Sequence, residues 1–393
     1  MAKKLRVGIL FGGRSGEHEV SLLSAASILK AIDHKKFDVV PIGITKEGRW
    51  LAAGDAHNLL EGNGPDAVEL AAADKEISPQ RKVILRAGDP HATPGAKLLH
   101  EGIPTLMAPE PPTTSTGLDV VFPVLHGTFG EDGTIQGLFE LAGIAYVGAG
   151  VLGSAAGMDK DVMKRLFAQA RLPIVKHVTL LRSDWERSPR KAIAQVEAAL
   201  QYPVFVKPAN LGSSVGISKA HDRKELGPAL DEAAKYDRKL IVEQGVGGKK
   251  SKARELEVAV LGNDDPKASV VGEIIPGKEF YDYEAKYLSE GSVPVIPARL
   301  TRAETKKIRE MAVAAFGACD LSGLARVDFL MEPDGKQRIF LNEVNTMPGF
   351  TKISMYPKLW EATGIEYTEL ITRLIELALE RQQEKNRNMY SRD

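Results

Sequence analysis

The first part of the chain alternates between two patterns of apolar residues, one typical of strands and one typical of helices. Residues 5–12 and 37–44 are apolar runs that predict buried strands, and residues 17–32 carry apolar side chains at helical spacing. Residues 118–125 predict a further buried strand before a glycine-rich boundary at Gly150. Because alternating strands and helices form parallel sheets with helices on both faces, we expect an open parallel α/β domain up to this point.

The alternation weakens over residues 50–117, where six prolines fall between Pro90 and Pro112 and predict loops and short strands. Further strands are predicted at residues 178–181, 203–208, 217–219, 239–244, 255–261, 269–275, 325–331 and 338–344. Helices are predicted at residues 154–170, 192–200, 303–316 and 368–380, with another that ends at Ala234. Single cores stop growing at about 250–300 residues, so the length predicts two or three domains, and the pattern along the chain favours three parts. They lie at residues 1–150, 151–246 and 247–393.

The strongest chemical pattern is the predicted hairpin ARVDFLMEPDGKQRIFLNEVN, in which Asp334 and Gly335 supply the turn. With a two-residue turn, Arg326 lies opposite Glu343, and Asp328 is diagonal to Glu343 on the same face. The side chains expected to point to the core are those of Val327, Phe329, Phe340 and Val344.

Two carboxylates and an amide converge in this hairpin, from Asp328, Glu343 and Asn345. Like charges so placed repel unless a cation lies between them. Hard oxygen ligands that leave positions for water and phosphate suit Mg²⁺ bound together with a nucleotide. The alternative is a solvent-exposed hairpin face with an ordinary Arg–Glu pair.

The segment VFVKPANLGSSVGISK places a glycine- and serine-rich turn after a strand that ends at Lys207. Backbone N–H groups and the hydroxyls of Ser213 and Ser214 can surround phosphate oxygens in such a turn, with the lysine supplying positive charge. A plain hairpin loop has the same pattern. The sequence contains no GxxxxGK[ST] run, which argues against a P-loop enzyme, so ATP bound here would lie on a sheet.

Two loops of the first predicted domain carry candidate substrate ligands. FGGRSGEHEVS follows the first strand, but Glu17 and Glu19 would repel a pyrophosphate at the helix N-terminus. The ammonium group of an amino acid suits this position better, unless both glutamates only complement the helix dipole. His126 opens HGTFGEDGTIQG at the carboxyl end of a strand, where open α/β sheets bind ligands, although a lone histidine is more often structural.

The composition favours small molecules as partners. Lys plus Arg equals Asp plus Glu at 52 each, so no net charge attracts nucleic acid or an anionic membrane. No apolar run approaches the roughly 20 residues of a membrane span, and the apolar run near Met1 leads to charged residues rather than to a signal-peptide cleavage site. The single cysteine, Cys319, has apolar neighbours and fits core packing in a reducing compartment. We therefore expect a soluble, cytoplasmic protein.

Residues 280–292 mix aromatic side chains with both charge signs and predict a mobile loop or lid. In chain order, GGRSGEHEVS, HGTFGEDGTIQG, GMDK, VKPANLGSSVG, YDYEAKYL, ARVDF and NEVNTMPGFT resemble the motifs of the D-alanine:D-alanine ligases of the ATP-grasp superfamily, from about residue 5 to 360. The resemblance implies an α/β and α+β chain with a three-domain ATP-grasp fold and a Rossmann-like N-terminal domain. Nucleotide is then held between the central and C-terminal sheets, and amino acids face the N-terminal domain.

The resemblance also implies three groups of site residues. Two metal ions, Mg²⁺ with Mn²⁺ as a substitute, are held by Asp328, Glu343 and Asn345. ATP is bound by Lys160, Lys207, Ser214, Glu243, Gln244, Val246, Glu255, Phe280 and Lys286. Substrate binding and catalysis involve Glu17, His126, Ser213, Tyr287, Arg326, Gly349, Ser354 and Met355. Leucine is frequent in the family at the position of Met355, and a contact through the backbone N–H survives that change.

The implied reaction joins two D-alanine molecules through an acyl-phosphate and supplies peptidoglycan synthesis, in a chain expected to form a homodimer. One carboxylate attacks the γ-phosphate of ATP, and the amine of the second D-alanine then attacks the acyl-phosphate. Glu17, Ser213 and Tyr287 resemble a hydrogen-bonded set that fastens the lid, whose closure excludes water. Arg326 and the backbone near Gly349 stabilise the tetrahedral intermediate. Because the lid tyrosine favours amines over hydroxy acids in the family, we expect a dipeptide product.

Three other functions share part of these features. Another ATP-grasp ligase has the hairpin and the lysines but need not have Glu17 and the lid. An oxidoreductase that binds NAD at the first glycine loop gives the Asp328, Glu343 and Asn345 group no task. A non-catalytic nucleotide-binding module needs no second substrate site. Phosphate release that requires ATP, Mg²⁺ and D-alanine together separates these alternatives.

Overall fold

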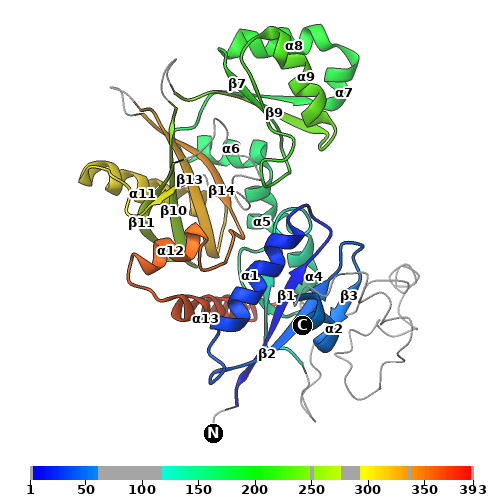
Figure 1. Ribbon diagram of the computed structural model, residues 1–393, viewed down its shortest axis with the longest axis vertical. Helices are drawn as coiled ribbons and strands as arrows, with labels where there is room; N and C mark the ends of the chain where they lie inside the picture. Colours follow the sequence, from blue (N-terminus) through cyan, green and yellow to red (C-terminus); the bar gives the residue numbers. More distant parts are fainter. Residues whose placement is uncertain (1–2, 61–116, 248–251, 276–292, 334–337, 391–393) are drawn as a thin grey trace. The chain divides into compact units, whose positions relative to one another are not determined.

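The computed structural model describes residues 3–60, 117–247, 252–275, 293–333 and 338–390 (Figure 1). The chain divides into two compact units, and the first comprises Met1–Gly148, Gly349–Lys352 and Glu366–Asp393. The second comprises Ala149–Pro348 and Ile353–Ile365. The division into three domains by chain order stays a prediction.

The first unit is built on a five-stranded sheet of order β3-β2-β1-β4-β5. Its strands are β1 (Leu5–Gly12), β2 (Phe37–Ile44), β3 (Trp50–Ala52), β4 (Val120–Val124) and β5 (Ala145–Tyr146). Strands β1, β2, β4 and β5 are parallel, and β3 is an antiparallel edge strand. The prediction of a parallel α/β arrangement is confirmed, because alternating strands and helices return each strand in the same direction.

Helices cover this sheet with their apolar side chains. They are α1 (His18–Ala31), α2 (Ala53–Leu60), α4 (Thr134–Ala142) and α13 (Tyr367–Lys385). Helix α13, near the end of the chain, packs against β4 and β5, and the Arg381 guanidinium lies 4.4 Å from the centre of the Tyr146 ring. The last long helix of the chain thus completes the core of the first unit.

The second unit contains an antiparallel four-stranded sheet of order β6-β9-β7-β8. Its strands are β6 (His177–Leu181), β7 (Val204–Pro208), β8 (Ser218–Ala220) and β9 (Lys239–Gln244). The helices α7 (Arg182–Arg187), α8 (Pro189–Ala199) and α9 (Arg223–Ala234) pack against this sheet (Figure 1). Buried apolar side chains from both layers form a continuous core.

The same unit contains an antiparallel five-stranded sheet of order β12-β11-β10-β13-β14. Its strands are β10 (Arg254–Gly262), β11 (Lys267–Ile275), β12 (Val293–Val295), β13 (Gly323–Met331) and β14 (Ile339–Asn345). The helices of this part are α5 (Val151–Met158), α6 (Lys160–Gln169), α11 (Arg302–Ala318) and α12 (Met355–Glu361). Side chains of α6 and α11 share one core with β10 and β13.

The predicted single helix over residues 154–170 is wrong. The backbone of Asp159 is extended, with φ −79° and ψ 102°, and separates α5 from α6. The Asp159 carboxylate accepts hydrogen bonds from the backbone N–H groups of Asp161 and Val162, so it caps α6. An aspartate within an apolar helical pattern is a start signal that periodicity alone overlooks.

Candidate active site

The hairpin of β13 and β14 brings the predicted metal ligands together in a register different from the expected one. Asp328 lies opposite Glu343, and Arg326 lies opposite Asn345. The expected pairing of Arg326 with Glu343 is wrong because Met331 pairs with Ile339 near the hairpin end and a bulge follows. Beyond the bulge the pairing is displaced by two residues in total, so Arg326, Asp328, Glu343 and Asn345 stay on the expected face.

The bulge also explains why the predicted burial of Phe340 in the core is wrong. Asp328 pairs with Glu343 whereas Phe329 pairs with Leu341, so Asn342 is the extra residue of β14. Ile339, Leu341 and Val344 are buried, but Phe340 is only half-buried, and the Arg338 guanidinium lies 5.6 Å from the centre of its ring. The placement of Phe340 in the core was therefore wrong, because strict alternation does not survive a bulge.

Three carboxylates form a row across adjacent strands, here called the carboxylate row: Glu257 of β10, Asp328 of β13 and Glu343 of β14. The Arg326 guanidinium binds Asp328 through two hydrogen bonds of 2.8 and 2.7 Å, and its Nε lies 3.2 Å from Glu257 Oε2. The Asn345 amide donates a 2.9 Å hydrogen bond to Asp328 Oδ2. Glu257 was not among the predicted residues.

The donor set of the row fits a hard divalent cation. Asp328 and Glu343 pair directly across β13 and β14, so their side chains lie on one face of the sheet, and Asn345 can offer its amide oxygen while its nitrogen binds Asp328. Among the residues that the structure describes, no group of three or more His, Cys, Asp or Glu side chains has the arrangement of a metal site.

A buried cluster of lysines lies beside the row. Lys160 donates a 2.8 Å hydrogen bond to the Leu211 carbonyl, and its Nζ lies 3.8 Å from Glu343 Oε2. Lys207 Nζ lies 2.7 Å from Glu243 Oε2. Two of the predicted phosphate-binding lysines are thus present in the second unit, and one of them contacts a predicted metal ligand.

Lys164 completes this cluster and was missed from the sequence. Its Nζ lies 3.0 Å from Glu243 Oε1 and donates a 3.1 Å hydrogen bond to the Asn342 carbonyl. Burial opposes the charge of Glu243, but the lysine charges of Lys164 and Lys207 hold the pKa of this carboxyl well below its usual range. Burial lowers the pKa of Lys164, whereas the pull of Glu243 raises that of Lys207 despite burial.

The predicted phosphate turn has an unusual backbone. Ser213 and Ser214 have φ values of 52° and 59°, in the left-handed region, and Gly216 follows with φ 70°. Non-glycine residues in this region cost on the order of 1–3 kcal/mol each and cluster at functional sites. The turn therefore has a strained backbone at both serines, and its phosphate-binding role stays a prediction.

Of the predicted base and ribose contacts, Glu243 and Gln244 lie at the end of β9. Gln244 ends this strand, and its side-chain oxygen accepts a hydrogen bond from the Gln201 backbone. Val246 follows in the half-buried connection, and Glu255 lies on β10. The predicted residues Phe280, Lys286 and Tyr287 lie outside the described residues.

In the first unit, the structure brings Glu17 and the His126 loop together. A Cβ atom on Gly127, whose φ is 73°, would lie 2.5 Å from Glu17 Oε2, so the absence of a side chain lets the carboxylate approach the backbone. Ser15 donates a 2.7 Å hydrogen bond to the His126 carbonyl. The His126 ring lies 3.1 Å from Ser24 Oγ and 3.9 Å from a Glu131 oxygen.

Glu19, by contrast, forms an ion pair with Lys46 at the surface. The hydrogen bond from Lys46 lowers the pKa of the Glu19 carboxyl. Glu17 is buried at the N-terminus of α1, so the two glutamates of this loop differ in environment. Of the two, Glu17 is the one that lies beside the His126 loop.

The predicted contacts of the second substrate begin α12. Ser354 is the N-cap residue and Met355 the first residue of this helix. A Cβ atom on Gly272 would lie 2.6 Å from Met355 Cε, and Gly272 pairs with Glu257 of the carboxylate row. Met355 therefore packs its side chain on the face of the sheet that bears the row. Gly349 is half-buried in the first unit.

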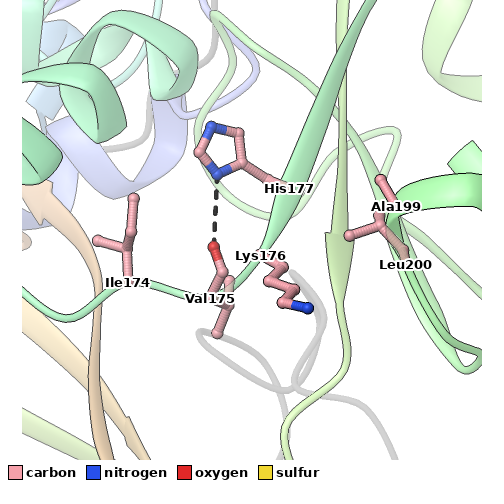
Figure 2. Close-up of a pocket in the computed structure, with 6 residues that line it drawn as sticks. All are labelled: Ile174, Val175, Lys176, His177, Ala199 and Leu200. Carbon is pink, nitrogen blue, oxygen red and sulfur yellow. Dashed lines mark hydrogen bonds between the residues drawn. The ribbon is translucent and has the colours of Figure 1, made fainter. Parts of the chain in front are cut away.

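Figure 2 shows a pocket elsewhere in the second unit, lined by Ile174, Val175, Lys176, His177, Ala199 and Leu200. The His177 ring turns back to the Val175 carbonyl at 3.4 Å. None of the predicted site residues lines this pocket. It lies in the segment between α6 and β6 and beside the end of α8.

Comparison with known protein families identifies the family to which the chain belongs. The D-ala D-ala ligase N-terminus family matches residues 6–149, and the D-ala D-ala ligase C-terminus family matches residues 166–376. The chain belongs to the D-alanine–D-alanine ligase family. Together the two matches cover most of the sequence, including the loops of Glu17 and His126 and the carboxylate row.

Relatives in this family match over nearly the full length. The D-alanine–D-alanine ligase of Heliobacterium modesticaldum is 51% identical over 99% of this chain and 98% of its own. That of Bacillus cytotoxicus is 48% identical over 99% of both chains.

Solved structures agree with this assignment. The D-alanine-D-alanine ligase from Coxiella burnetii has a TM-score of 0.77 and 35% identity, over 98% of this chain and 97% of its own. The VanG D-Ala:D-Ser ligase from Enterococcus faecalis has a TM-score of 0.75 and 35% identity, over 96% of this chain and all (100%) of its own. The prediction of an ATP-grasp fold is confirmed. Among the residues that the structure describes, no helix has the length and apolar character needed to cross a membrane.

Proposed function

We propose that this ATP-dependent ligase joins two D-alanine molecules into D-alanyl-D-alanine for peptidoglycan synthesis. The observation that supports it most is that a chain matching its relatives over nearly their whole length also carries the carboxylate row with Arg326, Asn345 and Lys160 around it. An NAD-dependent oxidoreductase would have no catalytic or binding role for the carboxylate row. A non-catalytic module has no use for the pairing of Glu17 with the His126 loop.

The nucleotide is held by lysines and the metal ligands in this proposal. Lys160 and Lys207 contact the phosphates, helped by the turn of Ser213 and Ser214. Asp328, Glu343 and Asn345 would hold two Mg²⁺ ions, or Mn²⁺ in their place. Bound Mg²⁺ supplies positive charge that offsets the negative charge of the transferred phosphoryl group.

The chain's own residues orient the two amino acids. Glu17 receives the ammonium group of the first D-alanine, which leaves its carboxylate free to attack the γ-phosphate. The amine of the second D-alanine attacks the acyl-phosphate, and Arg326 and the backbone near Gly349 stabilise the charge that develops. The backbone at Ser354 and Met355 binds the second carboxylate.

We further propose that the enzyme acts in the cytoplasm as a homodimer. ATP is available there, and the single cysteine of the sequence fits a reducing compartment. Light scattering coupled to size-exclusion chromatography measures the mass of the assembly against 42.6 kDa for one chain.

The test of this function is a phosphate-release assay with mass spectrometry of the product. We expect release only when ATP, Mg²⁺ and D-alanine are all present, with D-alanyl-D-alanine as the product. Because one structural relative is a D-Ala:D-Ser ligase, D-serine is offered as a competing second substrate, together with D-lactate. Release without D-alanine, or equal incorporation of D-lactate at neutral pH, would contradict the proposal.

A further inference from the structure

Lys164 is a buried charged residue to which neither the resemblance nor the proposed function gives a task. Its side chain is 1% exposed, and that of Glu243, which it contacts, is 4% exposed. A lysine is almost never buried to this degree unless it is paired. A positive charge at this depth therefore needs a cause in its surroundings.

The contacts of Lys164 connect two elements of the second unit. From α6, its ammonium reaches Glu243 at the end of β9 and the carbonyl of Asn342, the bulged residue of β14. The residue after Asn342 is Glu343 of the carboxylate row. Lys164 thus touches both sides of the region that the proposed function assigns to the nucleotide.

The charges of this cluster do not balance within direct contact. Glu243 is one carboxylate between two ammonium groups, at 3.0 Å from Lys164 and 2.7 Å from Lys207. One positive charge is therefore in excess. Glu343 and Glu255 also attract Lys207 from a longer distance, but the proposed function assigns them to metal and ribose. A buried excess charge is costly unless an anion compensates it.

We propose that Lys164 is a positioning residue that satisfies Glu243, so that the charge of Lys207 remains available to the nucleotide phosphates. Without Lys164, Glu243 and Lys207 form a neutral pair, and the excess charge disappears. The neutral pair also keeps the fold intact, because no buried charge is left alone. This inference rests on the proposed function.

The experiment compares the dissociation constants of Mg²⁺–ADP and adenosine by calorimetry. Adenosine lacks phosphates, so the ratio of the two constants reports on phosphate binding alone. We expect Lys164→Met and Lys164→Gln to weaken Mg²⁺–ADP by at least about tenfold, the loss of one charge-assisted interaction, with adenosine unchanged. Glutamine keeps a donor for the Asn342 carbonyl, so it separates charge from hydrogen bonding.

Two further variants sharpen the test. The double variant Lys164→Met with Glu243→Gln removes the carboxylate that would neutralise Lys207, so the lysine charge is again available to the phosphates. We therefore expect the ratio of the Mg²⁺–ADP and adenosine dissociation constants to return most of the way to that of the unaltered chain. Lys235→Met removes an equal charge from an exposed pair with Glu232 in the same unit and should leave the ratio unchanged. Thermal unfolding of every variant confirms that it is folded.

Three outcomes would overturn the inference. The first is that both Lys164 variants bind Mg²⁺–ADP as tightly as the unaltered chain. The second is that Mg²⁺–ADP and adenosine weaken equally, which indicates only a structural role. The third is that the double variant recovers nothing. An unaltered chain that binds no Mg²⁺–ADP would instead contradict the proposed function, and the inference would fall with it.

Discussion

At the scale of single residues, charged side chains are buried in this chain where opposite charges meet them. Lys239 lies between Asp159 and Asp161, at 2.5 and 3.3 Å, just as Glu243 lies between two lysines. Breaking such a buried group leaves a charge uncompensated, which is far more costly than losing a surface pair. The buried groups are therefore where single substitutions have the clearest effects.

Asp159 offers a test of stability against pH. We expect Asp159→Ala to cost at least about 1 kcal/mol of unfolding free energy at neutral pH, because it removes the cap of α6 and the partner of Lys239. Burial raises the pKa of the Asp159 carboxyl, but the hydrogen bonds from Lys239, the Val162 backbone and Asn210 outweigh it, so the pKa is lowered from 3.8.

The sign of the pH effect follows from this shift. A lowered folded-state pKa gives stability that is present above pH 3.8 and lost as the pH falls through the lower folded value. The unfolding temperature of the unaltered chain should exceed that of Asp159→Ala at neutral pH, and this difference should shrink below about pH 4. Asp184→Ala, which breaks the exposed pair with Arg187, is the control and should change little. A difference in unfolding temperature that grows in acid would contradict the stabilising role of the ionised Asp159 carboxylate.

Met355 tests how the second substrate is bound. The side chain packs on Gly272, so Met355→Leu is a nearly volume-conserving change that should cost less than about 1.5 kcal/mol in stability. If the backbone N–H binds the second carboxylate, the KM for the second D-alanine should stay within about twofold, since ground-state binding is unchanged. A large rise in this KM with unaltered stability would show that the side chain itself contacts substrate.

At the scale of elements, the predictions succeeded where local pattern decides the structure. Strands β1, β2 and β9 begin and end at the predicted residues, because apolar runs there are bounded by turn residues. Helices α7 and α12 were missed since both are short and have too few turns for a clear period. The bulge at Asn342 depends on pairing with β13, which no local pattern specifies.

Helix α5 provides a prediction about packing. A Cβ atom on Gly153 would lie 2.4 Å from the backbone oxygen of Asp320, which cannot move aside like a flexible side chain. We expect Gly153→Ala to destabilise the chain by about 1–3 kcal/mol, the usual cost of overpacking, although alanine favours helices. Chemical denaturation measures the change.

The matched control is Gly317 in helix α11, where an added Cβ atom meets nothing within 4 Å. Gly317→Ala should stabilise the chain by about 0.5–1 kcal/mol through helix propensity alone. Equal changes in the free energy of unfolding for Gly153→Ala and Gly317→Ala would show that the close approach of α5 to Asp320 does not affect stability.

At the scale of the whole molecule, the sequence predicted which side chains share the hairpin face but not all of the charged residues beside them. Hairpin periodicity placed Asp328, Glu343 and Asn345 on one face, because a register displaced by two residues leaves the face unchanged. Glu257 and Lys164 were missed because their partners are distant in sequence. The alternating acidic residues of β10 were the only local signal for Glu257.

The central claim is the proposal that Asp328, Glu343 and Asn345 hold a divalent cation together with the nucleotide. Its most direct test is Mn²⁺ binding, followed by electron paramagnetic resonance in the presence of ADP. The chain with Asp328→Asn and Glu343→Gln should bind Mn²⁺ far more weakly than the unaltered chain, because both charged oxygen ligands are lost. Glu332→Gln, on the same hairpin but paired with Arg338, should bind it normally. Equal Mn²⁺ binding by the double variant and the unaltered chain would contradict the claim.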